Sequence, residues 1–186
     1  MTQVRAFLAI DIDEDLKAKI YKIIKEFKQI DANIKYVELD NLHLTLKFFG
    51  DIDTEGIELL SSKISSVVEN FEKFPIKIKG CGAFPNTNRI KVIWLGIDED
   101  ELVKKLHDEL DGEFVKLGFD KDKKFSTHLT IGRMKSAKGK SKVKSTIDEF
   151  SDVEIGEMEV SQIILKKSTL TPSGPIYEDL EIFELW

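Results

Sequence analysis

Two nearly identical tetrapeptides constrain the fold of this chain more than any other feature of its sequence. They are His43-Leu44-Thr45-Leu46 and, 85 residues later, His128-Leu129-Thr130-Ile131. In both, apolar residues alternate with the histidine and the threonine, a period typical of a strand with one buried face. Side chains two residues apart on a strand share a face, so each motif presents an imidazole and a hydroxyl together. The recurrence at about half the chain length indicates an internal repeat.

The segments around the motifs alternate between helical and strand-like periodicity. Apolar residues recur every three or four positions in four segments, which predicts helices beginning after Asp13 and over 55–70, 98–117 and 145–150. Continuous or alternating apolar runs predict strands over 4–10, 34–38, 42–49, 74–80, 89–97, 127–133, 153–160, 162–167 and 177–185. The polar, lysine-rich stretch 136–144 is expected to be a loop. Short connections favour hairpins over parallel crossovers, so the predicted fold class is α+β with antiparallel sheets, in one domain over 1–186.

Composition sets limits on the function. A 186-residue chain with 41% hydrophobic residues can bury a core without disulfides. The net charge of −6 argues against a protein that coats long nucleic acid through a uniformly basic surface. The single cysteine, Cys81, fits a reducing compartment. No apolar run approaches the roughly 18 residues of a membrane helix, and acidic residues directly follow the apolar amino-terminal run. We therefore expect a cytoplasmic protein that does not enter membranes.

The paired motifs suggest acid–base chemistry. A single His-x-Thr is more often a polar patch on the wet face of a strand, but its recurrence in matched contexts favours a catalytic pair. Histidine titrates near pH 6.5, so one imidazole can act as a general base and another as a general acid. The hydroxyls of Thr45 and Thr130 can donate to non-bridging phosphate oxygens. Strict alternation puts Arg133 on the opposite face of its strand, unless a bulge at Gly132 turns it toward a phosphate.

Other kinds of site have weaker support. The third histidine, His107, lacks a motif and is expected on the surface of its helix. We find no cysteine partner or H-E-x-x-H pattern for a metal, no G-x-S-x-G elbow, and neither a P-loop nor a G-x-G-x-x-G fingerprint. The sequence therefore predicts no metal and no cofactor.

Four segments together resemble a known family. They are Arg5-Ala6-Phe7-Leu8-Ala9-Ile10, Asn41 to Gly50 around the first motif, His128 to Arg133 around the second, and Ser168 to Glu178 near the end. These segments resemble the two-histidine phosphoesterase superfamily, specifically its RNA 2′,3′-cyclic phosphodiesterase (LigT-like, 2′-5′ RNA ligase) branch. Ser126-Thr127 departs from the family, whose members often carry a proline before the second motif.

The resemblance implies two similar α+β lobes related by a pseudo-twofold axis, with the motifs facing each other across a cleft. It also implies metal-independent opening of an RNA 2′,3′-cyclic phosphate to a 2′-phosphate. In that scheme His43 is the general acid and His128 the general base. Thr45 and Thr130 hold the phosphate oxygens, with Arg133 as a further contact. The reverse reaction would join RNA ends, such as tRNA halves, through a 2′-5′ bond.

Two alternatives remain open from the sequence. One is a phosphodiesterase for a small cyclic nucleotide or an ADP-ribose cyclic phosphate, and the other is a non-catalytic module that binds RNA ends. Tyr177 is a candidate for stacking on a terminal base, ahead of Phe48 and Phe84, which are expected in the core. Five lysines beside Arg133 are candidates for guiding RNA: Lys135, Lys138, Lys140, Lys142 and Lys144. We expect a monomer.

Overall fold

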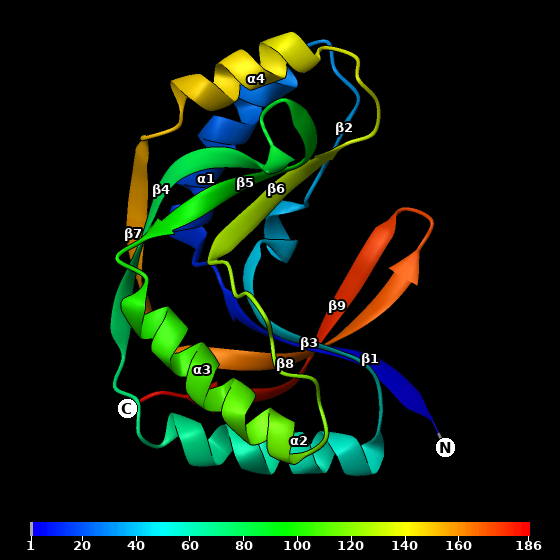
Figure 1. Ribbon diagram of the computed structural model, residues 1–186, viewed down its shortest axis with the longest axis vertical. Coiled ribbons are helices and arrows are strands. Elements are labelled where there is room, and N and C mark those ends of the chain that lie inside the picture. The colour runs from blue at the N-terminus through cyan, green and yellow to red at the C-terminus, as the bar shows by residue number, and fades with distance from the viewer. Residues whose placement is uncertain (1) are drawn as a thin grey trace.

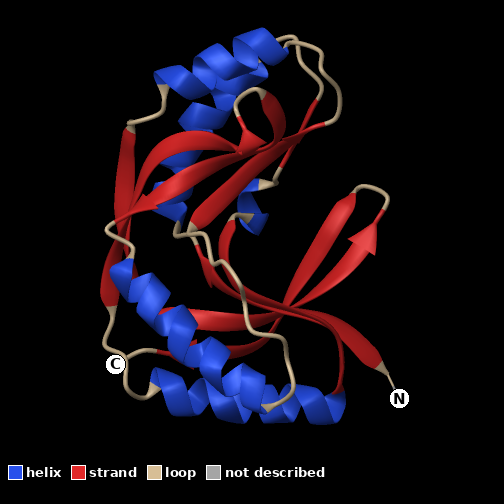
Figure 2. Ribbon diagram, viewed as in Figure 1, coloured by secondary structure: helices blue, strands red, loops and turns tan. Residues whose placement is uncertain are grey.

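The computed structural model describes residues 2–186 and contains two antiparallel sheets with helices on their outer faces (Figure 1, Figure 2). Sheet A has the strand order β3-β1-β8-β9 and sheet B the order β2-β6-β5-β4-β7. The strands of sheet A are β1 (Gln3–Asp11), β3 (His43–Asp53), β8 (Gln162–Thr171) and β9 (Gly174–Glu184). Those of sheet B are β2 (Ile34–Tyr36), β4 (Phe74–Asn86), β5 (Arg89–Asp98), β6 (His128–Met134) and β7 (Glu154–Val160). This confirms the α+β class with antiparallel sheets.

Short acidic side chains cap two of the four helices within residues 2–186, α1 (Glu14–Lys28) and α2 (Thr54–Val68). The other two are α3 (Glu101–Lys116) and α4 (Lys140–Glu149). A 3-10 turn, Leu39–Asn41, precedes β3. The carboxylate of Asp13 accepts from the backbone N–H of Leu16 at 2.8 Å, and Asp53 accepts from that of Gly56 at 2.8 Å. Each of these two caps satisfies an amide that the first helical turn leaves without a partner.

The two halves of the chain exchange elements, which joins the lobes. Strands β2 and β4 of the first half pair with β6 and β5 in sheet B. Strand β8 of the second half pairs with β1 in sheet A, and β9 pairs with β8 there. Two helices are exchanged as well. Helix α1 of the first half packs with α4 on sheet B, and α3 of the second half packs with α2 on sheet A. The motif strands β3 and β6 hold matching places, each beside the first strand of its half (Figure 1). The layout thus has the expected pseudo-twofold relation.

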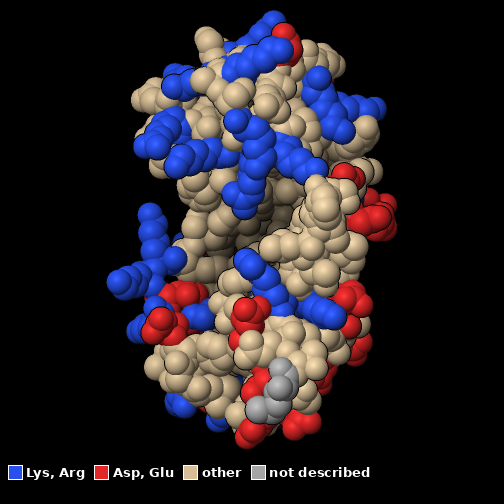
Figure 3. Space-filling model, turned by 90° about the vertical axis from the view of Figure 1, so that its right-hand side faces the viewer, with Lys and Arg blue, Asp and Glu red and all other residues tan. Residues whose placement is uncertain are grey.

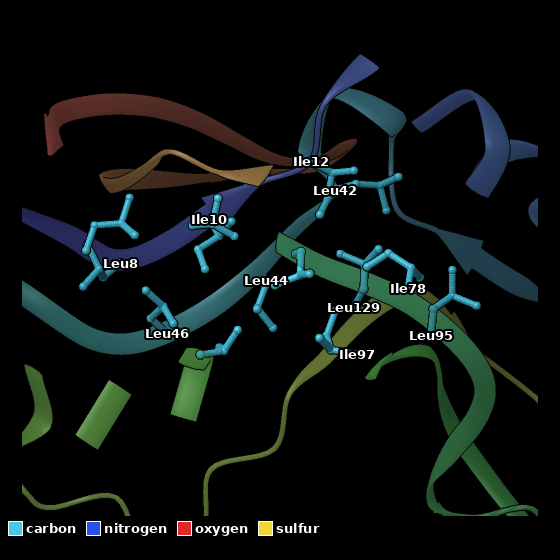
Figure 4. Close-up of a cluster of buried hydrophobic side chains, with 14 of the residues drawn as sticks. Leu8, Ile10, Ile12, Leu42, Leu44, Leu46, Ile78, Leu95, Ile97 and Leu129 are labelled. Atoms are coloured by element: carbon cyan, nitrogen blue, oxygen red, sulfur yellow. The ribbon is translucent and has the colours of Figure 1, made fainter. Parts of the chain in front are cut away.

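The apolar residues that alternate with the motif side chains lie in the core. Leu44 and Leu129 are both fully buried, as the period-two pattern predicts. Figure 4 shows them pointing from their strands into one cluster, together with Leu8, Ile10, Leu46, Ile78 and Leu95. Burial of this shared core fixes which face of each motif strand is left for the histidines and threonines.

The structure corrects two element boundaries of consequence. Helix α4 starts at Lys140, so about half of the stretch expected as a loop is helical; Val143 and Ile147 are buried four residues apart, a spacing that the flanking lysines obscure. Gly139, at φ 74°, turns the chain into this helix. Strands β8 and β9 extend to a tight turn at Gly174, which makes a longer hairpin than predicted. Among residues 2–186, no helix has the length and apolar character needed to cross a membrane.

Candidate active site

The histidines and threonines of both motifs line one cleft between the lobes. This cleft has a volume of about 470 Å³, and its walls come from β1, β2, β3, β6 and the β8–β9 hairpin. The motif side chains that line it are His43, Thr45, His128 and Thr130. Figure 3 looks into this hollow; on the face that it shows, Lys and Arg gather on the lobe above, whereas the lobe below carries most of the visible Asp and Glu together with some Lys and Arg.

A main-chain carbonyl holds His43. Its Nδ1 donates to the carbonyl oxygen of Asn41 at 2.7 Å, which leaves Nε2 to interact with the Thr45 hydroxyl at 2.9 Å. Asn41 ends the turn before β3, and its side-chain amide donates to the Pro175 carbonyl of the β8–β9 hairpin at 3.3 Å. The carbonyl that orients the ring is therefore itself anchored. A hydrogen bond at Nδ1 fixes the ring and its tautomer, and directs Nε2 toward the cleft.

His128 repeats this arrangement on the other lobe. Its Nδ1 donates to the carbonyl oxygen of Ser126, two residues earlier, at 3.0 Å. The ring of Phe84 contacts the imidazole edge-on, with 4.9 Å between centroids. With Nδ1 occupied, the neutral ring presents the unprotonated Nε2 as a proton acceptor. The departure Ser126-Thr127 keeps the carbonyl that this geometry needs.

Burial is the main influence on the pKa of both histidines. It lowers the pKa of His43, although the hydrogen bond to Asn41 and the nearby carboxylate of Asp11 act in the opposite direction. Burial also lowers the pKa of His128; the hydrogen bond to Ser126 opposes this effect, and the charge of Arg133 adds to it. Both rings therefore favour the neutral form more than a free histidine does.

A β-bulge in each motif strand shapes the cleft wall. On β6, Thr130 pairs with Trp94 and Gly132 with Ile93, so Ile131 is an extra residue. The bulge makes Ile131 and Gly132 both face the core and returns Arg133 to the face of Thr130. Of the two possibilities left open by the sequence, strict alternation is therefore wrong and a bulge next to Gly132 is observed, so Arg133 lines the cleft.

The first motif has the equivalent bulge. Thr45 pairs with Ala9 and Lys47 with Leu8, so Leu46 is the extra residue. Phe48 then takes the place in β3 that Arg133 holds in β6. It lines the cleft with 50% of its surface exposed, and the guanidinium of Arg5 lies 5.0 Å from its ring centroid. The expectation of a core Phe48 was wrong for the same reason.

The other aromatic candidates divide between the cleft and its surroundings. Tyr177 lines the cleft, with its ring edge-on to His43 at 5.4 Å and to Phe7 at 5.0 Å. Phe84 packs against Trp94 behind His128 and is not among the residues that line the cleft.

Sequence reasoning missed several cleft residues, and Lys35 is the one among them that adds positive charge beside Arg133. Lys35 lies beside Arg133 in the β2–β6 pairing and lines the cleft. Its place in a three-residue edge strand gave no signal of this.

His107 is buried, so its assignment to the helix surface was wrong. Only 3% of it is exposed, and its Nε2 donates to a carboxylate oxygen of Asp122 at 2.7 Å. The helical spacing held a signal, because His107 shares a stripe with Val103, Leu110 and Phe114. His107, Asp111 and Asp122 form the one group among residues 2–186 with the ligand types and spacing of a metal site. It lies outside the cleft.

Comparison with known proteins identifies the family. The family model "LigT like Phosphoesterase" matches the chain twice, over residues 10–94 and again over 95–177, with one histidine motif in each match. The chain belongs to this family and is therefore a phosphoesterase. The double match corresponds to the two halves that the repeated motif predicts.

Relatives within the family are more specific. An RNA 2′,3′-cyclic phosphodiesterase of Methanothermobacter thermautotrophicus is 44% identical, covering 98% of this chain and 100% of the relative. Another, of Methanocaldococcus jannaschii, is 45% identical over a match that covers 94% of this chain and 97% of the relative. The crystal structure of TT0787 of Thermus thermophilus matches with a TM-score of 0.84 and 25% identity, over 97% of both chains. The chain thus spans nearly the full length of these proteins.

Proposed function

We propose that this phosphoesterase opens the 2′,3′-cyclic phosphate at an RNA end and leaves a 2′-phosphate, by metal-independent acid–base catalysis. The observation that carries the proposal is the matched pair of imidazoles. Each has Nδ1 fixed by a carbonyl two residues earlier, and both line one cleft with a threonine hydroxyl beside them. The names of the relatives supply the substrate class.

The proposed step moves one proton at each histidine. His128 Nε2 accepts a proton from a water molecule as its oxygen attacks phosphorus. The bond from phosphorus to the 3′ oxygen breaks, and protonated His43 gives its Nε2 proton to that oxygen. The products are a 2′-phosphate and a free 3′-hydroxyl. Thr45 and Thr130 donate to the non-bridging oxygens, where negative charge accumulates.

The surroundings of the two histidines support this division of roles. Asp11 lies opposite His43 in the β1–β3 pairing, and its negative charge favours a protonated ring there. Lys166, held by Asp11 and Asp179, reduces this effect. The charge of Arg133 favours a neutral His128. An acid is best placed near a carboxylate and a base near a cation, so His43 fits the acid and His128 the base.

The cleft walls suggest how an RNA end binds. Phe48 and Tyr177 offer aromatic surfaces to a terminal base, and Arg133 and Lys35 offer charge to the backbone phosphates. Five further lysines, three of them on α4, are the candidates for guiding RNA toward this charge: Lys135, Lys138, Lys140, Lys142 and Lys144. Two of them, Lys138 and Lys144, form ion pairs with Asp31 and Asp148. The site uses both halves of one chain, which fits an active monomer. By microscopic reversibility the same groups would join tRNA halves through a 2′-5′ bond.

A short RNA with a 2′,3′-cyclic phosphate end, incubated with EDTA, tests the proposal. We expect turnover to a product whose phosphate is on the 2′ position. A small cyclic nucleotide or an ADP-ribose cyclic phosphate in equal amount should compete poorly; preferential turnover of either would make it the substrate. Binding without turnover would favour a binding module, and a 3′-phosphate product or restoration of lost activity by a metal would contradict the mechanism.

A further inference from the structure

A buried cluster of charged residues lies behind β3, away from the cleft. Lys47 is only 7% exposed, because the bulge at Leu46 turns it toward the core. Its ammonium donates to Asp111 Oδ1 at 2.7 Å, to Asp122 Oδ1 at 2.8 Å and to the carbonyl oxygen of Asp120 at 2.8 Å. Burying a charged lysine costs desolvation free energy, which is offset only when the ammonium makes well-aligned hydrogen bonds to acceptors such as these three.

Every carboxylate oxygen of Asp111 and Asp122 already has a donor. Asp111 Oδ2 accepts from the backbone N–H of Asp122 at 3.0 Å, and Asp122 Oδ2 accepts from His107 at 2.7 Å. The Lys47 ammonium supplies the positive charge that a bound cation would bring. The cluster is thus a closed hydrogen-bonded network rather than an open set of metal ligands. We call Lys47, His107, Asp111 and Asp122 the staple.

The staple joins the two motifs. Lys47 lies two residues after Thr45 on β3, whereas Asp122 lies in the irregular segment that connects α3 to β6. His107 stacks on Phe125 of the same segment, with centroids 3.8 Å apart and planes 1° from parallel. The next residue is Ser126, whose carbonyl oxygen holds Nδ1 of His128. The segment that orients one histidine is therefore anchored to the strand that carries the other.

This anchoring matters because the connecting segment has no regular backbone hydrogen bonding of a helix or strand to hold it. Residues 119–127 form neither helix nor strand, so side-chain contacts must fix the position of the Ser126 carbonyl. A misplacement of about 1 Å at a reacting group can cost about 10²-fold in rate. The second motif has no counterpart to Lys47, since Gly132 occupies the equivalent position, where a Cβ would lie 2.9 Å from Ile34.

We propose that the staple is a positioning device that fixes His128 relative to His43 through the Ser126 carbonyl. The proposal rests on the proposed function for its effect on rate, but not for its effect on the His128 ring. Lys47 is a positioning residue, since it does not line the cleft.

Nitrogen-15 NMR of the histidines tests the structural part without substrate. In the wild type above its pKa, His128 should show a single tautomer with the proton on Nδ1. In Lys47→Met, and in the milder Asp122→Asn, we expect His128 to average between tautomers while His43 keeps one. The control is Leu60→Ala, a buried residue of α2 that belongs neither to the staple nor to the cleft, and it should leave His128 unchanged.

Kinetics test the effect on catalysis at a temperature where all variants are folded by circular dichroism. Lys47→Met should lower kcat at least about tenfold with KM within about threefold, because the loss is one of alignment rather than of binding. Lys47→Arg should recover part of kcat. The double variant Lys47→Met/Asp122→Asn should lose no more kcat than the worse single variant, because both substitutions disrupt the same hydrogen-bonded network.

Two results would overturn the proposal. One is a His128 that keeps a single tautomer in both staple variants, and the other is a kcat loss no larger than that of Leu60→Ala. Either would reduce the staple to a stabilising ion pair. A wild type without turnover on RNA cyclic phosphates would contradict the proposed function instead, and the NMR result would still decide the role of the staple.

Discussion

At the scale of single residues, the two histidines share geometry but not surroundings. Both rings are fixed through Nδ1, yet Asp11 lies near His43 and Arg133 near His128. Sequence spacing identified the pair and placed both rings on wet strand faces. It did not distinguish the acid from the base, because the charges that differ between the two sites are those of Asp11, on the neighbouring strand β1, and Arg133, which a bulge in β6 turns toward the cleft.

Burial predicts how the histidines titrate in the free enzyme. The pKa of both rings should fall below the ordinary 6.5, since burial disfavours the charged form. The unfolded chain then binds these protons more readily than the folded protein, so the free energy of unfolding decreases as pH falls through 6.5. Proton NMR titration of the two imidazoles measures both pKa values directly. A pKa at or above the ordinary value for either ring would contradict the account of its environment.

At the scale of elements, the sequence predicted the type of nearly every helix and strand but not their irregularities. The apolar alternation located β3 and β6, because the pattern depends only on local burial. The bulges at Leu46 and Ile131 depend on the register with β1 and β5, which local pattern does not encode. His107 differs, because its stripe with Val103 and Leu110 indicated burial, whereas Asp122, the partner that makes a buried imidazole tolerable, lies outside the helix.

Close packing at the second bulge makes a testable prediction. A Cβ at Gly132 would lie 2.9 Å from a methyl of Ile34 and 3.4 Å from the carbonyl oxygen of Lys35. Gly132→Ala should therefore destabilise the protein by about 1–3 kcal/mol, as overpacking does. The matched control is Gly112→Ala in α3, where nothing lies within 4 Å of the new methyl; it should stabilise by about 0.5–1 kcal/mol. Urea unfolding measures both, and equal stability of the two variants would contradict the packing described.

At the scale of the whole molecule, the repeat revealed two halves but not how they interlock. Each sheet takes two strands from the other half, β2 and β4 into sheet B and β8 and β9 into sheet A. Such exchange leaves no trace in periodicity, because an inserted strand has the same apolar pattern as any other. It also explains why neither of the two lobes that form the cleft corresponds to one continuous half of the chain.

The exchange predicts that the halves cannot fold alone. A chain divided in the β4–β5 turn, into 2–87 and 88–186, leaves sheet A without β8 and β9 in the first fragment and sheet B without β2 and β4 in the second. Each fragment should show the poorly dispersed amide spectrum of an unfolded chain, and mixing should restore dispersion and cleavage activity. A well-dispersed spectrum from either fragment alone would contradict the single-domain organisation that we propose for 1–186.

The central claim is that His43 protonates the departing 3′ oxygen while His128 activates water. An RNA whose cyclic phosphate carries sulfur at the bridging 3′ position tests it most directly, because a thiolate leaves without a proton. With the natural oxygen substrate, His43→Ala and His128→Ala should each lose about 10²-fold or more. With the sulfur substrate, His43→Ala should recover to within about tenfold of the wild type and His128→Ala should not. Rescue of His128→Ala instead, or of neither variant, would contradict the assignment.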